Sequence, residues 1–146
     1  MKFIELVQEY KYWRSKLDDN MAQENEVRDL MSVPKKILPS GIGAGNHVAP
    51  QEKYIEMLDH IYDKREVILQ NLQHARDTIG NVITLEIEDD IKRKVVMYLI
   101  FNEKKRSWGE IADKVGYTER WVQKAYKDCR FILDAIEVQY IPIVEL

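Results

Sequence analysis

The sequence predicts an all-α protein: an N-terminal antiparallel helical hairpin, coiled-coil-like in its spacing, followed by a C-terminal helix-turn-helix module. Two long segments carry apolar residues at alternating intervals of three and four, the spacing of a helix that buries one seam. The 146 residues include only 4 Pro and 6 Gly, so long helices can run without interruption. A short C-terminal span carries the cap and turn residues of two consecutive helices.

The first helix is predicted over residues 2–32. Its seam passes through two polar positions, Asn20 and Glu24, before it becomes apolar again. The apolar seam residues are Phe3, Leu6, Tyr10, Trp13, Leu17, Val27 and Met31. A Gly/Pro-rich stretch at 34–50 should then break the helix, because Pro removes a backbone donor and Gly favours turns.

The second helix is predicted over 51–79, and Gly80-Asn81 should end it, since Gly commonly closes helices. Residues 1–80 would therefore form the hairpin. Its seam residues are Tyr54, Leu58, Ile61, Arg65, Ile68, Leu72, Ala75 and Ile79. Counting outward from the loop, Arg65 falls near Asn20 and Glu24, and Trp13 falls near Leu72 and Ala75. One polar layer of this kind can fix the register of a helix pair.

A third helix is predicted over about 86–101, with the acidic run EIEDD (86–90) at its start, where carboxylates favour the helix dipole. Its buried stripe is expected to hold Ile91, Val95, Tyr98 and Leu99. Residues 101–106, FNEKKR, then form a short polar turn.

Residues 107–130 carry the helix-turn-helix signals. Ser107 and Glu110 have the S-x-x-E spacing of a capping box, which satisfies free backbone N–H groups at a helix start. Ile111, Ala112 and Val115 form the buried side of the short helix that follows. Gly116 can end that helix with a positive φ, and Thr118 is a suitable N-cap for the next helix.

The second helix of the motif separates apolar from basic residues. Val122, Ala125, Tyr126, Cys129 and Leu133 share one side. The opposite side carries the candidate DNA contacts: Arg120 and Gln123 for base edges, and Lys124 and Lys127 for phosphates. Arg can bond guanine bidentately and Gln can bond adenine in the same way.

Other residues near the motif are further candidates for contact with DNA or with other parts of the protein. Lys104, Lys105 and Arg106 are candidate phosphate contacts, and Thr118 belongs to the same interface. Trp121 lies off the buried stripe, so it either flanks the DNA groove or packs on the first helix of the motif. Phe131 falls on the basic face, where it is expected to meet the hairpin or another subunit.

Charge is distributed unevenly along the chain. The net charge is −3, yet residues 92–130 carry eleven Lys and Arg against five Asp and Glu. The remaining residues carry eleven against twenty. Such asymmetry between segments is typical of proteins that bind nucleic acid. We therefore expect a double-stranded DNA partner.

Several function classes are not expected. No catalytic constellation or nucleotide-binding motif is present, so the protein is predicted not to be an enzyme and to need no cofactor. The set Glu56, His60 and Asp63 shares a helix face, but zinc sites usually need more ligands, so a solvated face is the preferred interpretation. No stretch approaches the about 20 apolar residues that span a bilayer, so no membrane partner is expected. The apolar tail, 137–146, should pack on the protein's own core or on a neighbouring subunit.

Residues 95–133, VVMYLIFNEKKRSWGEIADKVGYTERWVQKAYKDCRFIL, resemble region 4 of sigma-70-type factors. They are most similar to phage-encoded regulators that use this module, the late-gene activators of the RinA and ArpU type. The "SWGEIA" and "GYTER" segments carry the likeness, which would place a region 4-like domain at 84–136. The resemblance implies transcription regulation in a phage or prophage, in the cytoplasm of a bacterial host cell. Trp121 and Tyr126 depart from the relatives' pattern, so the target sequence is not carried over.

Partners and alternatives follow from the same layout. Host RNA polymerase is a second candidate partner, and a homodimer would read two half-sites. One alternative is a phage small terminase subunit, which joins a helix-turn-helix to an oligomerising helical region and forms rings. The other is an adaptor that binds a protein through its basic face and has no salt-dependent affinity for DNA.

Overall fold

The protein is described here by a computed structural model that covers residues 1–32, 50–102 and 106–143. Its order of elements is α1 (Phe3–Met31), α2 (Pro50–Glu86), α3 (Asp90–Ile100), α4 (Trp108–Val115) and α5 (Glu119–Asp134). The prediction of an all-α fold is confirmed for these residues. The loop predicted at 34–50 lies outside them, apart from Pro50 at the start of α2. None of the described helices is both long and apolar enough to cross a membrane.

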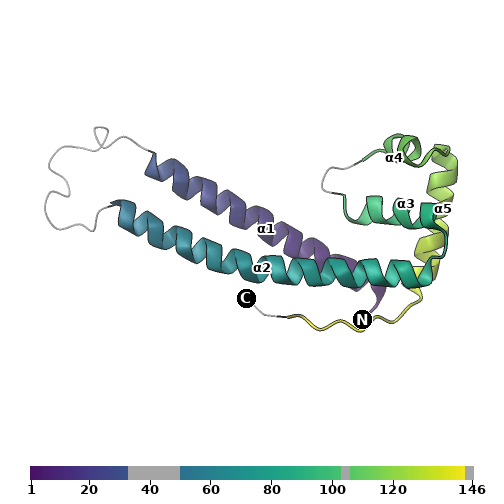
Figure 1. Ribbon diagram of the computed structural model, residues 1–146, viewed down its shortest axis with the longest axis horizontal. Coiled ribbons are helices and arrows are strands. Elements are labelled where there is room, and N and C mark those ends of the chain that lie inside the picture. The colour runs from purple at the N-terminus through teal and green to yellow at the C-terminus, as the bar shows by residue number, and fades with distance from the viewer. Residues whose placement is uncertain (33–49, 103–105, 144–146) are drawn as a thin grey trace, which may run out of the picture.

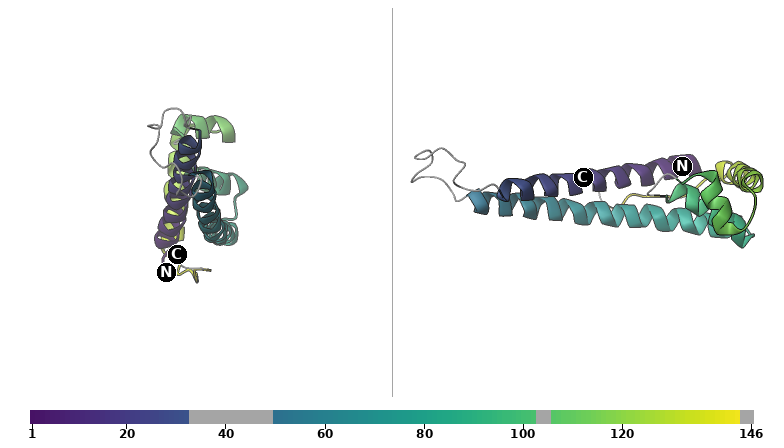
Figure 2. Two further views of the ribbon diagram at one scale, coloured as in Figure 1. Left: turned by 90° about the vertical axis from the view of Figure 1, so that its left-hand side faces the viewer. Right: turned by 90° about the horizontal axis from the view of Figure 1, so that it is seen from above.

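Helices α1 and α2 form a long antiparallel hairpin, and α3, α4 and α5 gather at the end away from the 33–49 connection (Figure 1). We call these three helices the head. Seen from above, α1 and α2 lie side by side over most of their length (Figure 2). The apolar seam that the sequence predicts joins them, because most of its residues are buried and Met31, Tyr54 and Leu72 pack against them partly buried.

The polar layer of the hairpin lies where the seam spacing predicts it. The guanidinium of Arg65 donates from Nε to Asn20 Oδ1 over 2.7 Å and from Nη2 to Glu24 Oε1 over 2.6 Å. Asn20 is only 3% exposed, and its amide donates to the carbonyl of Ile61 over 2.9 Å. Glu24 also accepts hydrogen bonds from Arg28, and these guanidinium partners lower the pKa of its carboxyl to about 2. The register prediction is confirmed.

Trp13 also lies where the hairpin register places it. It forms a buried cluster with Leu17 and Ile68, against which Leu72 packs. Ala75 belongs to the adjoining larger cluster.

The prediction that Gly80 ends the second helix is wrong. Helix α2 continues through Gly80 to Glu86, and its stripe of buried isoleucines continues with it, through Ile79 and Ile83 to Ile87 just beyond the helix. Gly80 keeps the helical sign of φ, since the only positive φ in the described residues belongs to Gly116. Burial of this apolar stripe outweighs the roughly 1 kcal/mol that an interior glycine costs a helix.

The third helix is shorter than expected and buries different residues. Asp89 caps it by accepting from the backbone N–H groups of Ile91 and Lys92, so the helix begins at Asp90. Its fully buried residues are Val95, Val96 and Ile100. The predicted Ile91, Tyr98 and Leu99 are only half-buried. The reason is that α3 is covered on two sides: Val96 and Ile100 pack into the hairpin core, and Val95 packs against α4 and α5.

The hairpin and the head share one core. The largest buried cluster draws residues from α1, α2, α3, α5 and the segment after α5, including Phe3, Ile83, Val96, Leu133 and Val138. The C-terminal tail extends this contact along α2 (Figure 1). There the ring of Tyr140 stacks on that of His74 at 4.8 Å, and the Ile143 N–H donates to Asn71 Oδ1 over 3.2 Å. Within the described part of the tail, Val138 packs into the protein's own core, one of the two expectations, whereas Ile141 is 81% exposed.

Candidate nucleic-acid interface

A three-residue turn, Gly116–Thr118, joins α4 to α5. Ser107 caps α4, as its Oγ accepts from the Glu110 N–H over 3.2 Å. Gly116 ends α4 with φ of 78°, and its N–H donates to the Ala112 carbonyl over 2.9 Å. Thr118 caps α5, as its Oγ1 accepts from the Trp121 N–H over 3.2 Å. The caps and the left-handed glycine predicted from the sequence are confirmed.

A small apolar core holds α5 against α3 and α4. Val95, Ile111, Ala112 and Val122 are buried together in it. The small side chain of Ala112 allows the two helices on either side of the turn to approach closely. Further along α5, Cys129 and Leu133 pack into the core shared with the hairpin. Helix α5 is therefore fixed along its length, which orients whatever its outer face carries.

The outer face of α5 is basic. Arg120, Gln123, Lys124 and Lys127 are all exposed, while the buried residues of the helix lie on the other side. At 100° per residue, the three cations fall within about 60° of one another. None of them lies within ion-pair distance of a carboxylate in the described residues. The face also carries acid, since Glu119 is in the first turn and Asp128 follows Lys127.

Trp121 packs inward rather than standing on the basic face. Its ring stacks on that of Tyr117, with centroids 4.0 Å apart and planes 20° apart, and it also contacts the core around Val122. Trp121 thus packs against the core that contains Ile111 and Ala112 of α4, the first helix of the motif, as one of its two expectations has it. Tyr117 remains 44% exposed, so this aromatic pair forms the rim of the face beside the turn.

Phe131 continues the basic stripe one turn beyond Lys127, and it is 82% exposed. Contact with the hairpin of its own chain was one of two expectations for Phe131, and the structure does not show it. Arg130, its neighbour, turns the other way: its guanidinium lies 5.3 Å from the Phe3 ring centroid and pairs with Asp134 at 3.1 Å. Arg130 therefore ties α5 to α1 and is not part of the basic face.

Of the other predicted phosphate contacts, only Arg106 belongs to the described residues, and it does not join this face. Lys104 and Lys105 lie outside the described residues. Arg106 is half-buried and points toward α3, where its Cζ lies 5.2 Å from the Tyr98 ring centroid. The exposed basic face therefore consists of Arg120, Gln123, Lys124 and Lys127, with Thr118 and Trp121 beside it at the turn.

The site offers binding groups rather than reactive ones. Burial raises the pKa of the Cys129 thiol, so it is a weak nucleophile at neutral pH. Within the described ranges, no group of three or more His, Cys, Asp or Glu side chains is placed to hold a metal ion.

No protein-family model, curated protein or solved structure matches this chain.

Sequence reasoning missed a second group of cations, which is spread over three elements. Arg76 of α2, Arg106 before α4 and Lys114 of α4 line one cleft together with Tyr98 of α3. The first of these lies 30 positions from the second in sequence, so periodicity could not bring them together. The signal in the sequence was the aromatic pair Tyr98 of α3 and Phe101 directly after it, since half-buried aromatic rings attract cations.

Proposed function

We propose that this protein binds double-stranded DNA by placing α5 in the major groove. The observation that carries the proposal is the outer face of α5, where Arg120, Gln123, Lys124 and Lys127 are exposed opposite a buried apolar stripe. The helix starts directly after a tight turn and is fixed by α3 and α4. In DNA-binding helix pairs of this kind, the residues of the second helix nearest its N-terminus meet the base edges.

The chemistry of the four residues suits that role. A helix about 10–12 Å across fits a groove about 12 Å wide. Arg120 and Gln123 lie in the first turns of α5, where bidentate bonds to guanine and adenine are geometrically available. Lys124 and Lys127 follow along the same face and suit phosphates, since an ammonium acts as a point charge toward a phosphate oxygen.

The biological role that we propose is transcription regulation in a phage or prophage. The resemblance of residues 95–133 to region 4 of sigma-70-type factors supports this role, and it makes host RNA polymerase a candidate partner. A single head buries limited DNA surface, so we propose that a homodimer reads two half-sites.

A packaging role is the second candidate. On the hairpin, Met21, Ile55 and Leu69 are about half exposed, which suits assembly with further copies. A small terminase subunit would use such contacts to form a ring. Light scattering separates the two roles, because a ring of many subunits has several times the mass of a dimer.

The test is fluorescence-anisotropy binding to mixed genomic duplex fragments across a salt series. The variant is Lys124→Gln/Lys127→Gln, and the matched control is Lys53→Gln/Lys64→Gln, which makes the same charge change at exposed positions of α2. Each lost phosphate contact should lower the slope of log affinity against log salt by about 0.9. The slope for the Lys124/Lys127 variant should be lower by close to twice that value, and the control variant should keep the wild-type slope.

The proposal fails if the folded wild-type protein does not bind duplex at low salt. It also fails if the control variant weakens binding as much as the α5 variant does. In either case, a protein partner for the basic face becomes the preferred interpretation.

A further inference from the structure

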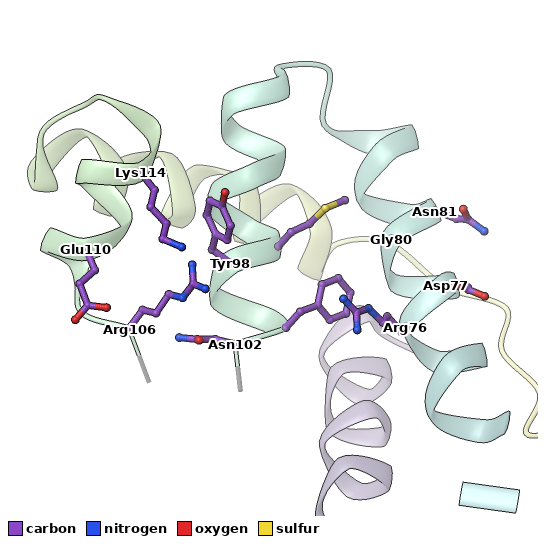
Figure 3. A pocket seen from close by; sticks show the side chains of 11 residues that line it. Arg76, Asp77, Gly80, Asn81, Tyr98, Asn102, Arg106, Glu110 and Lys114 are labelled. Carbon is purple, nitrogen blue, oxygen red and sulfur yellow. The ribbon is translucent and has the colours of Figure 1, made fainter. Parts of the chain in front are cut away.

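A cleft lies between α2 of the hairpin and the α3–α4 side of the head (Figure 3). Charged side chains of both the hairpin and the head line this cleft. Arg76 and Asp77 belong to α2, and Glu110 and Lys114 belong to α4. Arg106 enters it just before α4 begins. The cleft is therefore formed where the hairpin meets the head.

Two cations of the cleft converge on one aromatic ring. The Cζ of Arg106 lies 5.2 Å from the Tyr98 ring centroid, and the Nζ of Lys114 lies 5.4 Å from it. Both side chains point toward the ring, whereas the carboxylate of Glu110 points away from them (Figure 3). The ring attracts each cation, but two like charges held at one ring repel each other, so an anion placed between them is favoured.

The hydrogen bonding of the Arg106 guanidinium is a second observation that favours an anion in the cleft. Its Nη1 is buried and has no hydrogen-bond partner among residues 1–32, 50–102 and 106–143. In the described part of the chain, no carboxylate forms an ion pair with Arg76, Arg106 or Lys114. Asp77, the acid beside Arg76, accepts a hydrogen bond from Gln73 instead, over 2.8 Å. A desolvated guanidinium donor without an acceptor is costly, so an acceptor from outside the chain would be bound favourably.

The third cation limits the kind of ligand. The Cζ of Arg76 lies 5.1 Å from the Phe101 ring centroid, and Tyr10 packs edge-on against that ring at 5.2 Å. Cations therefore lie beside both aromatic rings of the cleft, so the surface offered to a ligand is positively charged. The ligand would be recognised by its negative charge. Guanidinium groups match the oxygen geometry of phosphate, which carries up to about two negative charges.

We propose that this cleft binds a small molecule through its phosphoryl group, with Arg106 and Lys114 as the principal contacts and Arg76 as a third. A free small molecule fits better than a DNA backbone, because no residue of α5 lines the cleft and Arg106 is half-buried there. The site is separate from the basic face of α5, and the inference does not depend on DNA binding.

The test is isothermal titration of the full chain with inorganic pyrophosphate. Wild-type protein should bind it, and Arg106→Gln/Lys114→Gln should weaken binding about tenfold or more, since a charge-assisted hydrogen bond is worth about that factor in affinity. Lys53→Gln/Lys64→Gln makes a matched charge change at exposed positions of α2 and should leave pyrophosphate binding unaltered. Far-UV circular dichroism melts establish that each variant is folded.

The inference is overturned by any of three results: no heat of binding with wild-type protein, equal binding by the Arg106/Lys114 variant, or equal weakening by the Lys53/Lys64 variant. A duplex-binding arm separates the two phosphate sources. If the cleft variant weakens duplex binding as much as the α5 variant does, the cleft belongs to a DNA interface and the small-molecule proposal fails. A wild-type protein that binds pyrophosphate but no duplex would refute the proposed function and leave this inference standing.

Discussion

Replacing a glycine by alanine should change stability in opposite directions at Gly116 and Gly80. A Cβ built at either position has no heavy atom within 4 Å, so neither change creates a steric clash with a neighbour. Gly116 has φ of 78°, where alanine costs about 1–2 kcal/mol. Gly80 lies inside α2 with helical φ, where alanine should gain about 0.5–1 kcal/mol. The two variants should therefore differ by about 2 kcal/mol in the free energy of unfolding.

Urea unfolding followed by far-UV circular dichroism measures both variants under one set of conditions. The slope of the free energy against urea should stay unchanged, so that the midpoints report stability directly. Gly116→Asn serves as a further control and should cost less than Gly116→Ala, because asparagine tolerates the left-handed region better. An alanine at 116 as stable as wild type, or a destabilising alanine at 80, would refute the reasoning from backbone conformation.

Three further predictions concern the hairpin and the head. Arg65→Met should cost about 1–3 kcal/mol in urea unfolding, because the buried Asn20 Oδ1 loses its donor, and a neutral result would contradict a structural role for the polar layer. Glu24 has its carboxyl pKa lowered from 4.5 to about 2, so the stability that it contributes is present above pH 4.5 and is lost as the pH falls toward 2. The stability difference between wild type and Glu24→Gln, measured across that range, should shrink toward acid, and a constant difference would refute the assignment. Thr118→Ala should cost about 1 kcal/mol through loss of the α5 cap, and Thr118→Ser should restore most of it.

The sequence was most informative where the structure depends on local spacing. The spacing of three and four along both seams predicted that Arg65 lies opposite Asn20 and Glu24. This was possible because the position of the loop fixes which residues of two antiparallel helices face each other. Caps at Ser107 and Thr118 could be read in the same way, as each satisfies backbone groups within its own first turn.

Features that depend on tertiary contacts were harder to predict. Gly80 looked like a helix end, but whether a glycine ends a helix depends on whether burial continues beyond it, as it does at Ile83. Helix α3 buries two sides rather than one, so a single-stripe interpretation misplaced Tyr98 and Leu99. Arg106 was grouped with the basic face on charge alone, whereas its direction is decided by the ring of Tyr98.

Because α2 is unbroken through Gly80, the length of this helix fixes the distance between its two ends. Its 37 residues, at about 1.5 Å each, give a rod about 55 Å long that begins beside the 33–49 connection and ends in the core under α5. Because α2 has no break at Gly80, the far tip of the hairpin and the head cannot pivot independently at that glycine. The two ends of α2 are therefore separated by a span equal to about 16 base pairs of B-form duplex.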